Sequence, residues 1–178
     1  MLILKSTKVI LISAKARHGK DSAAKILQDL LQQFGKTVLV CHFADCLKML
    51  CQNSYGWIQG DKGVIGRTIL QNVATDYRNN NPDCWANIVK QIAISCPEEY
   101  VIIPDCRYQN EPKAFCDMDT TVIRIERPNF DNGLTDQQKN HLSEIDMDHY
   151  KFNKVIINDG TLENLKEKIK QVFQLEVE

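Results

Sequence analysis

The residues with the clearest chemical potential lie at positions 14–22, where the chain reads Ala-Lys-Ala-Arg-His-Gly-Lys-Asp-Ser. The related pattern Gly-x-x-x-x-Gly-Lys-Ser/Thr binds phosphate, because backbone N–H groups and a helix N-terminus converge on the anion while the lysine reaches the outer phosphates. Here Ala14 replaces the first glycine, and Asp21 stands where the magnesium-binding hydroxyl is expected, with Ser22 one residue later. These residues therefore predict a phosphate loop, and a strand-to-helix turn with a solvated Lys20 is the alternative that spacing leaves open.

A second candidate group follows the apolar run at 100–103. Asp105 comes just after this run, where phosphate-loop enzymes place the carboxylate that holds magnesium, directly or through water. Arg107 follows two residues later, and its planar guanidinium group suits phosphate oxygens. An ion pair between Asp105 and Arg107 is the alternative. Arg124 and Arg127 add cations near the end of another expected strand, and ligands of open α/β sheets bind at such ends.

Weaker candidates follow the expected strand at 37–41. Phe43 is placed to stack on a base and Asp45 to accept from a sugar hydroxyl, whereas the alternatives are a core phenylalanine and a helix-capping aspartate. Trp85 is a further candidate, although a tryptophan belongs to the core more often than it provides a surface for base stacking. The residues that we expect to select an acceptor are Phe43, Asp45, Lys48, Arg67, Asp76 and Trp85.

Alternating apolar strands and amphipathic helices must position these groups, which is the pattern of a parallel sheet covered by helices. We expect strands at 8–13, 37–41, 100–103, 120–125 and 154–157, and helices at 22–34 and 162–173. Pro104 should end the third strand, because proline cannot donate to a strand ladder.

Two segments stand apart from this alternation. Between the second and third strands, residues 44–96 show three short helical patterns separated by glycine-rich and asparagine-rich stretches, and we call them the helical insertion. Residues 127–144 are polar, contain Gly133 and predict a mobile flap, which we call the lid segment. An acceptor is expected to sit in the insertion.

Composition limits the classes of protein that the chain can represent. With 178 residues, 43% hydrophobic and 25% charged, it fits one soluble globular domain. The net charge of −1 argues against a nucleic-acid partner. Seven cysteines without a Cys-x-x-Cys pair predict free thiols in a reducing compartment, and no apolar run is long enough to cross a membrane. We therefore expect a cytoplasmic protein.

Seven segments in series give the chain a family resemblance. They occupy residues 14–22, 43–48, 70–76, 81–87, 104–111, 141–144 and 158–165. Together they resemble the deoxynucleoside monophosphate kinases encoded by bacteriophages and related viruses. That family's phosphate loop ends in Gly-Lys-Asp-Ser/Thr, and its most diagnostic signature, Asp-x-Arg-Phe/Tyr-x-Asn-Glu, is matched by Asp105, Arg107, Tyr108, Asn110 and Glu111.

The resemblance implies an α/β phosphate-loop fold, similar to nucleoside monophosphate kinases, with a parallel sheet of about five strands, an acceptor-binding insertion and a lid. It implies transfer of the ATP γ-phosphoryl group to a deoxynucleoside monophosphate, with Mg²⁺ as the metal. Lys20, Asp105, Arg107 and Arg127 would be catalytic, and Asp21, Ser22 and Asp105 would organise the metal. The residues expected to bind ATP are Ala14, Lys15, Ala16, Arg17, His18, Gly19, Lys20, Asp21, Ser22, Asn158, Gly160 and Thr161.

Two other functions remain open at this point. A kinase of another small phosphorylated acceptor, similar to the animal-type phosphomevalonate kinases, would also carry Gly-Lys-Asp in its phosphate loop. A catalytically silent nucleotide-binding protein is the second alternative, and Ala14 is the feature that favours it. The expected partners are small nucleotides, in the host cytoplasm if a virus encodes the chain. The accepted bases and the formation of a homodimer are left open.

Overall fold

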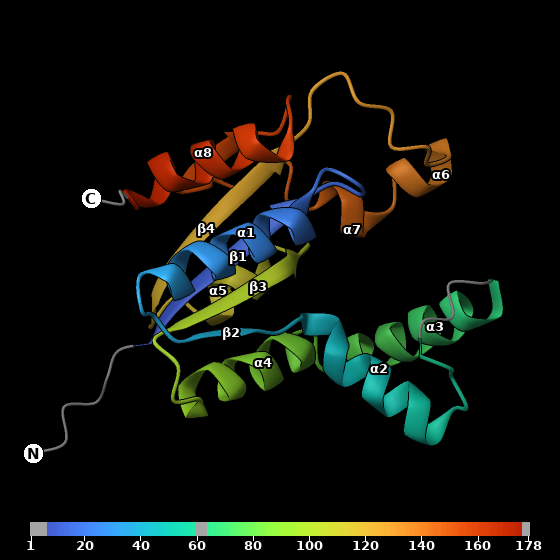
Figure 1. The fold of residues 1–178 in the computed structure, drawn as a ribbon. Helices are drawn as coiled ribbons and strands as arrows, with labels where there is room; N and C mark the ends of the chain where they lie inside the picture. Colours follow the sequence, from blue (N-terminus) through green and yellow to red (C-terminus); the bar gives the residue numbers. More distant parts are fainter. Residues whose placement is uncertain (1–6, 60–63, 176–178) are drawn as a thin grey trace, which may run out of the picture.

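The computed structural model describes residues 7–59 and 64–175, without the side chains of residues 64 and 67. Its centre is a parallel sheet in the order β2-β3-β1-β4-β5. The strands are β1 (Lys8–Ala14), β2 (Val38–Val40), β3 (Tyr100–Cys106), β4 (Asp119–Glu126) and β5 (Lys154–Ile157). The expected five-stranded parallel sheet is confirmed. Because all strands are parallel, their carboxyl ends share one edge of the sheet (Figure 1).

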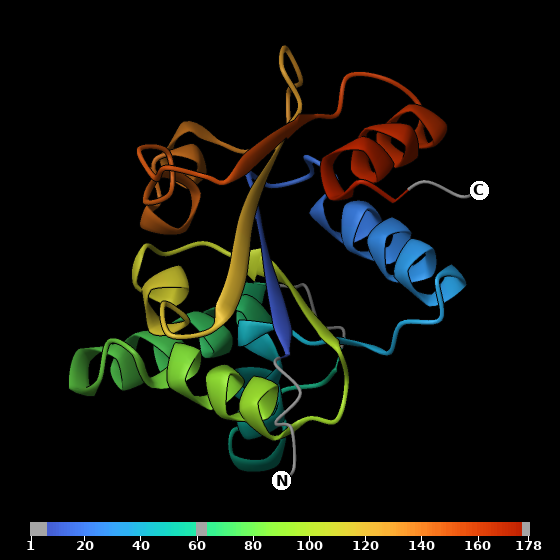
Figure 2. The same cartoon turned by 90° about the vertical axis from the view of Figure 1, so that its left-hand side faces the viewer.

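Helices cover both faces of the sheet. On one face lie α1 (Lys20–Gln33) and α8 (Leu162–Phe173), and on the other lie α4 (Cys84–Ser95) and the short α5 (Asn110–Ala114) (Figure 2). The insertion also contains α2 (Phe43–Ser54) and α3 (Val64–Asn80). Two single-turn helices, α6 (Asp136–Lys139) and α7 (Leu142–Ile145), lie beyond the carboxyl edge (Figure 1). In the described part of the chain, no helix combines the length and the apolar character needed to cross a bilayer.

Strand periodicity divides the core into two layers. Ile10 and Ile12 of β1 face the layer of α1 and α8, whereas Val9 and Leu11 pack on the opposite side with Val89 of α4. Successive side chains of a strand point to opposite faces, so a continuous apolar run is required when helices cover both faces. The apolar runs seen in the sequence therefore place the sheet in the middle of the molecule.

The helical insertion has a small core of its own. Its buried members come from α2, α3, α4 and the segment after α2, and they are Leu47, Cys51, Trp57, Val73, Ala74 and Trp85. Burial of these side chains holds the insertion helices against one another. The three helices expected in this region are confirmed.

The expected end of the third strand at Pro104 is wrong, because β3 continues to Cys106. The N–H of Cys41 donates to the carbonyl oxygen of Ile102 at 3.1 Å, and β2 pairs with β3 only as far as that residue. A residue two positions further along a strand presents its N–H on the same side. The missing N–H of Pro104 therefore faces an edge where no partner strand requires it. This extension carries Asp105 into the end of the strand.

Phe115 tests the packing beneath the sheet, because its side chain is fully buried beside Val122 and Phe43. Phe115→Ala should lower the free energy of unfolding by about 3–5 kcal/mol, since it removes a large apolar group and leaves a cavity. Urea unfolding followed by circular dichroism measures the loss. The matched control is Cys116→Ala at an exposed neighbour, which should change stability by less than about 0.5 kcal/mol. A similar small change for both variants would contradict this packing.

Candidate functional site

The phosphate loop leaves the carboxyl end of β1 and enters α1 through Gly19. Gly19 has a φ of 98°, in the left-handed region that favours glycine. A Cβ at this position would also lie 2.5 Å from Nδ2 of Asn158. The same Nδ2 donates to the carbonyl oxygen of His18 at 3.0 Å, so Asn158 holds the loop from the β5 side. Asn158 was expected to contact ATP, and that contact stays a prediction.

The first turn of α1 presents backbone N–H groups that have no acceptor in the described part of the chain. The N–H groups of Lys20, Asp21 and Ser22 have no hydrogen-bond acceptor among the described residues. The partial positive charge of a helix N-terminus adds to their attraction for an anion. Nζ of Lys20 pairs with Oδ1 of Asp21 at 2.6 Å, and the carboxylate of Asp21 is largely exposed. The loop therefore offers a cationic, donor-rich position at the carboxyl edge of the sheet.

Four consecutive loop residues contact the lid segment or the residues that follow it. The contacts are Lys15 Nζ to Asp148 Oδ2 at 2.7 Å, Ala16 N to Glu144 Oε2 at 2.9 Å, Arg17 Nη1 to Asn132 O at 2.9 Å, and Arg127 N to His18 Nδ1 at 3.0 Å. Burial, followed by the charges of Arg124 and Lys15, lowers the pKa of His18 from its ordinary value. A neutral ring suits its role, because Nδ1 must accept the N–H of Arg127. The lid segment is thus bound to the loop.

Glu144 connects the phosphate loop to Arg107. Its Oε2 accepts the N–H of Ala16 at 2.9 Å, and its Oε1 accepts from Nη1 of Arg107 at 2.6 Å. The side chain of Glu144 is 8% exposed. A carboxylate held by a backbone N–H and a guanidinium group forms charge-assisted hydrogen bonds, which are short and strong. The bridge brings Arg107 beside the loop. The expected place of Arg107 at the transferred phosphoryl group stays a prediction, and no role had been assigned to Glu144 itself.

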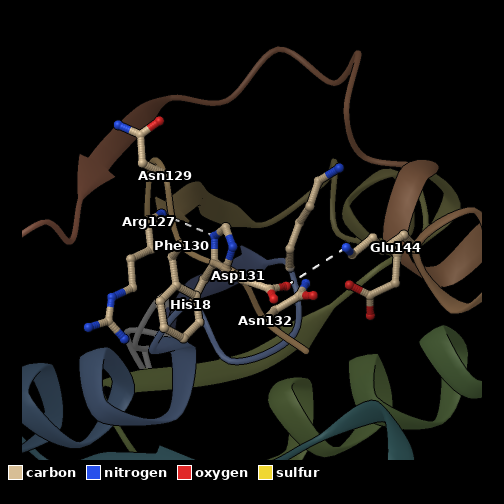
Figure 3. A pocket seen from close by; sticks show the side chains of 9 residues that line it. His18, Arg127, Asn129, Phe130, Asp131, Asn132 and Glu144 are labelled. Carbon is tan, nitrogen blue, oxygen red and sulfur yellow. Dashed lines mark hydrogen bonds and ion pairs between the residues drawn. The ribbon is translucent and has the colours of Figure 1, made fainter. Parts of the chain in front are cut away.

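Two pockets lie on either side of this bridge. The first, of about 530 Å³, is the lid pocket, lined by Lys15, His18, Arg127, Asn129, Phe130, Asp131, Asn132, Lys139 and Glu144. The second, of about 830 Å³, is the Arg107 pocket, lined by Ala16, Arg17, Gln71, Arg107, Gly133, Leu134, Gln137, Gln138, His141, Ser143 and Glu144. Among the residues that the structure describes, Glu144 is the one that lines both of these pockets. Figure 3 shows it across the lid pocket from Arg127.

Arg127 does not share a pocket with Arg107. Its guanidinium group lies 4.1 Å from the ring centre of Phe130, and the rings of Phe130 and His18 meet edge to face at 6.1 Å (Figure 3). Stacking of this kind attracts the cation to the aromatic face. Arg127 lines the lid pocket and Arg107 lines the other, and the expectation that both stabilise the transferred phosphoryl group stays a prediction.

Asp105 is used in a way that the sequence did not indicate. Its two carboxylate oxygens accept the backbone N–H groups of Phe43 and Ala44, at 2.9 and 3.2 Å. These groups lie in the first turn of α2, where a negative charge is stabilised by the helix dipole. Asp105 thus ties the insertion to the sheet, and it does not pair with Arg107. Its part in magnesium binding stays a prediction.

A buried glutamate supports the backbone of Arg107. Oε2 of Glu111 accepts the N–H of Arg107 at 2.6 Å and that of Tyr108 at 3.0 Å. Glu111 is 4% exposed. Burial raises its pKa to about 7, with Asp105 acting in the same direction, although the two backbone hydrogen bonds favour the charged form. Arg107 is therefore fixed at its backbone by Glu111 and at its guanidinium group by Glu144.

Two aromatic residues that we expected to contact an acceptor lie in the core, which corrects that expectation. Phe43 is 4% exposed, and its ring packs edge to face on Phe115 with the centres 6.3 Å apart. Trp85 is 5% exposed and packs against Tyr77 at 5.3 Å. Neither lines the two pockets, because each side chain faces the apolar layer beneath its helix.

Asp45, Lys48 and Asp76 do not line the two pockets either. Asp45 accepts the N–H of His42 at 2.8 Å and pairs with Lys48 at 3.3 Å, so its alternative role at the start of α2 is confirmed. Asp76 is exposed on α3, and the side chain of Arg67 lies outside the described residues. Among the described residues of the insertion, Gln71 is the one that lines the Arg107 pocket. It lies within one of the quoted family segments, but as a neutral side chain it was not selected.

The last expected ATP-binding residues form the start of α8. Thr161 accepts the N–H of Asn164 at 3.2 Å and so caps the helix. A Cβ on Gly160 would lie 2.7 Å from Oδ1 of Asn164, so a side chain at this position would displace the Asn164 amide that bonds to Thr161. These observations confirm the capped turn predicted before 162, and any contact of Gly160 or Thr161 with ATP stays a prediction.

The parallel sheet and the loop between β1 and α1 together define a phosphate-loop kinase fold. The chain is similar to the Mycobacterium tuberculosis APS kinase CysC, whose structure was solved in complex with AMPPNP and APS, over 96% of this chain and 97% of that chain. The TM-score is 0.55 at 12% identity, so this likeness concerns the fold alone.

Sequence comparison identifies the family. Residues 61–169, more than half of the chain, match the family model for deoxynucleotide monophosphate kinase. The chain belongs to the deoxynucleotide monophosphate kinase family, which confirms the resemblance seen in the motifs. The deoxynucleotide monophosphate kinase of Enterobacteria phage T4 is 32% identical over 117 residues, which are 61% of this chain and 45% of the phage protein. The match thus spans less than half the length of that relative.

A second relative covers more of both chains. The putative deoxynucleotide monophosphate kinase of Acanthamoeba polyphaga mimivirus is 27% identical over 85% of this chain and 88% of its own length. Both relatives carry the family's name, and the matches do not favour a phosphomevalonate kinase or a silent binding protein.

Asp105→Ala tests the link between β3 and α2. It should lower the free energy of unfolding by about 0.5–2 kcal/mol, because two N–H groups at the start of α2 lose their acceptor. Chemical denaturation gives the value. Asp119→Ala is the control, since the exposed carboxylate of Asp119 has no hydrogen bond among the described residues. Equal midpoints for the two variants would show that the Asp105 contacts do not stabilise the fold.

Proposed function

We propose that this protein transfers the γ-phosphoryl group of ATP to a deoxynucleoside monophosphate, giving a deoxynucleoside diphosphate and ADP. The observation that carries the proposal is the pairing of two features at one edge of the sheet. One is a helix start with unused N–H donors, and the other is Arg107, bridged to the same loop through Glu144. Family membership supports this choice of reaction.

The two pockets suit the two substrates. The lid pocket combines the rings of His18 and Phe130 with the cations of Lys15, Arg127 and Lys139, a set that suits a base and a polyphosphate tail. We assign ATP to this side, with its outer phosphates at the start of α1. The Arg107 pocket takes the monophosphate, because it offers a guanidinium group near the loop and is bordered by Gln71 of the insertion.

Transfer then needs little covalent chemistry from the protein. An oxygen of the acceptor phosphate attacks the γ-phosphorus, the bond from that phosphorus to the β–γ bridging oxygen breaks, and ADP leaves with the electron pair. Lys20 and the N–H groups of the loop neutralise charge on the ATP phosphates, while Arg107 orients the acceptor phosphate and the moving group. Positioning and charge stabilisation are the main protein contributions to such reactions. A lid held on the loop excludes water, which protects ATP from hydrolysis.

Magnesium belongs to the same proposal. Among the described residues, no group of three or more His, Cys, Asp or Glu side chains could hold a metal ion by itself. Mg²⁺ is usually held by one or two carboxylates together with substrate phosphates and water. The oxygen donors of Asp21, Ser22 and Asp105 are of the preferred kind, and we assign Mg²⁺ to them with ATP bound. When bound, the ion would neutralise charge on the phosphates.

A nucleotide panel tests the reaction. With Mg²⁺ and ATP, the wild-type protein should release ADP in the presence of at least one deoxynucleoside monophosphate, and the matching diphosphate should be found by chromatography. Ribonucleotides and phosphomevalonate are included as competing acceptors. ATP binding without a diphosphate from any acceptor would support the silent binding protein instead, and turnover of phosphomevalonate alone would support the other kinase.

Lys20→Ala tests the phosphate loop. The substitution should reduce kcat by about 100-fold or more, because it removes a cation that stabilises the transferring phosphates. Lys25→Ala is the matched control on the same helix, since Lys25 forms an exposed pair with Asp29 at 2.8 Å. That control should keep wild-type turnover, and both variants should unfold near the wild-type midpoint. Wild-type turnover by the Lys20 variant would remove this lysine from the reaction.

A further inference from the structure

We infer that Glu144 is a positioning residue that holds Arg107 against the phosphate loop throughout turnover. The inference rests on the proposed function and adds a residue that the family motif contains but to which no role had been assigned. Its starting point is the bridge from Ala16 through the Glu144 carboxylate to Arg107, with hydrogen bonds of 2.9 and 2.6 Å. Each carboxylate oxygen serves one partner, so a single side chain fixes the distance between the loop and the guanidinium group.

The bridge leaves part of Arg107 available to a substrate. Glu144 and the carbonyl oxygen of Ser143 both accept from Nη1. Among the described residues, Nε and Nη2 of Arg107 have no hydrogen-bond partner. A guanidinium group binds phosphate through two parallel N–H donors. Anchoring at Nη1 therefore orients the fork and keeps its other two nitrogens for a phosphate in the Arg107 pocket.

The position of Glu144 between the two pockets supports this role. It lines both the lid pocket and the Arg107 pocket. Direct phosphoryl transfer requires the acceptor oxygen and the γ-phosphorus to meet in line, at the boundary between the two sites. A side chain at this boundary that touches both the loop and Arg107 controls their relative placement. Small displacements at such a point strongly affect turnover.

The segment that follows Glu144 is fixed at two points. Gln109 donates to Asp146 through its backbone N–H and through its side-chain amide, both at 2.7 Å. Beyond it, Asp148 accepts from Lys15 at 2.7 Å and from Arg124 at 3.0 Å. The backbone of Glu144 is thus tied to the strand-end segment after Arg107 and to the phosphate loop itself. A latch that substrates must displace would need a freer segment, so these bonds favour a permanent support.

A double-mutant cycle tests the inference. Glu144→Ala should lower kcat by about 10- to 100-fold with a small effect on the KM for ATP, because Arg107 loses its anchor while the first turn of α1 is unchanged. In an Arg107→Ala background the same substitution should cause little further loss, because both variants remove one interaction. Glu144→Gln should give an intermediate kcat, since one of the two oxygens that accept from Ala16 and Arg107 is replaced by an NH2 group, which donates and cannot accept. Glu163→Gln, at an exposed position on α8, is the matched control and should keep wild-type kcat.

Three outcomes would overturn the inference. Additive losses in the Glu144 and Arg107 variants would show that the two residues act separately. A higher kcat or tighter nucleotide binding in Glu144→Ala would identify the bridge as a latch. A loss of activity that only follows the unfolded fraction, measured by denaturation of each variant, would assign Glu144 a purely structural role.

Calorimetric titration with deoxynucleoside monophosphates provides a readout that does not need turnover. The same four proteins of the cycle should show coupled losses of affinity for the monophosphate. Failure of the proposed function would appear differently, as a wild-type protein that binds nucleotide but forms no diphosphate. Additive affinities would refute the role of Glu144 even in that case.

Discussion

Parallel pairing of β1 with β3 on one side and with β4 on the other is the constraint on which the candidate site depends. Neighbouring parallel strands end at the same edge of a sheet. The segments that follow β1, β3 and β4 must therefore leave the sheet side by side. These segments are the phosphate loop, the turn that carries Arg107 and the start of the lid. None of these segments forms a site alone. The phosphate loop lies about a hundred residues from the other two in the chain, and only the formation of the sheet brings them together.

The end of β3 and the residues after it show how one short segment joins the parts of the molecule. Asp105 accepts from the first turn of α2, Arg107 donates to Glu144, and Gln109 donates to Asp146. Asn110 donates to Pro82 O and to Asp83 at 3.0 and 2.8 Å. The diagnostic Asp-x-Arg-Tyr-x-Asn-Glu pattern therefore has a physical basis, because its aspartate, arginine and asparagine each bond to a different part of the molecule and its glutamate holds the backbone between them. The sheet, the insertion and the residues around α7 are held together at this point.

Three arginines near the carboxyl edge of the sheet have different surroundings, and these separate a structural arginine from those that line the pockets. Arg124, 5% exposed, donates to Ser13 and Asp148 beneath the loop and supports the structure, although the sequence suggested a cation for the ligand. Arg127 stacks on Phe130 in the lid pocket, and Arg107 faces the other pocket. Burial with paired acceptors suits a structural arginine, whereas a partly free fork suits phosphate. The positions of these three arginines along the chain do not reveal their different roles, whereas their surroundings in the folded structure do.

The sequence by itself determined the five strands, the helices at 22–34 and 162–173, the phosphate loop and the family, because hydrophobic periodicity and turn chemistry depend on residues that are close in the chain. It did not determine that Phe43 and Trp85 face the core, that β3 runs through Pro104, or that Gln71 and Glu144 reach the site. Those features depend on which neighbour each side chain meets, and that is decided by sheet order and helix packing between distant parts of the chain. A carboxylate in a polar segment such as 141–144 has no special character until folding places it between Ala16 and Arg107.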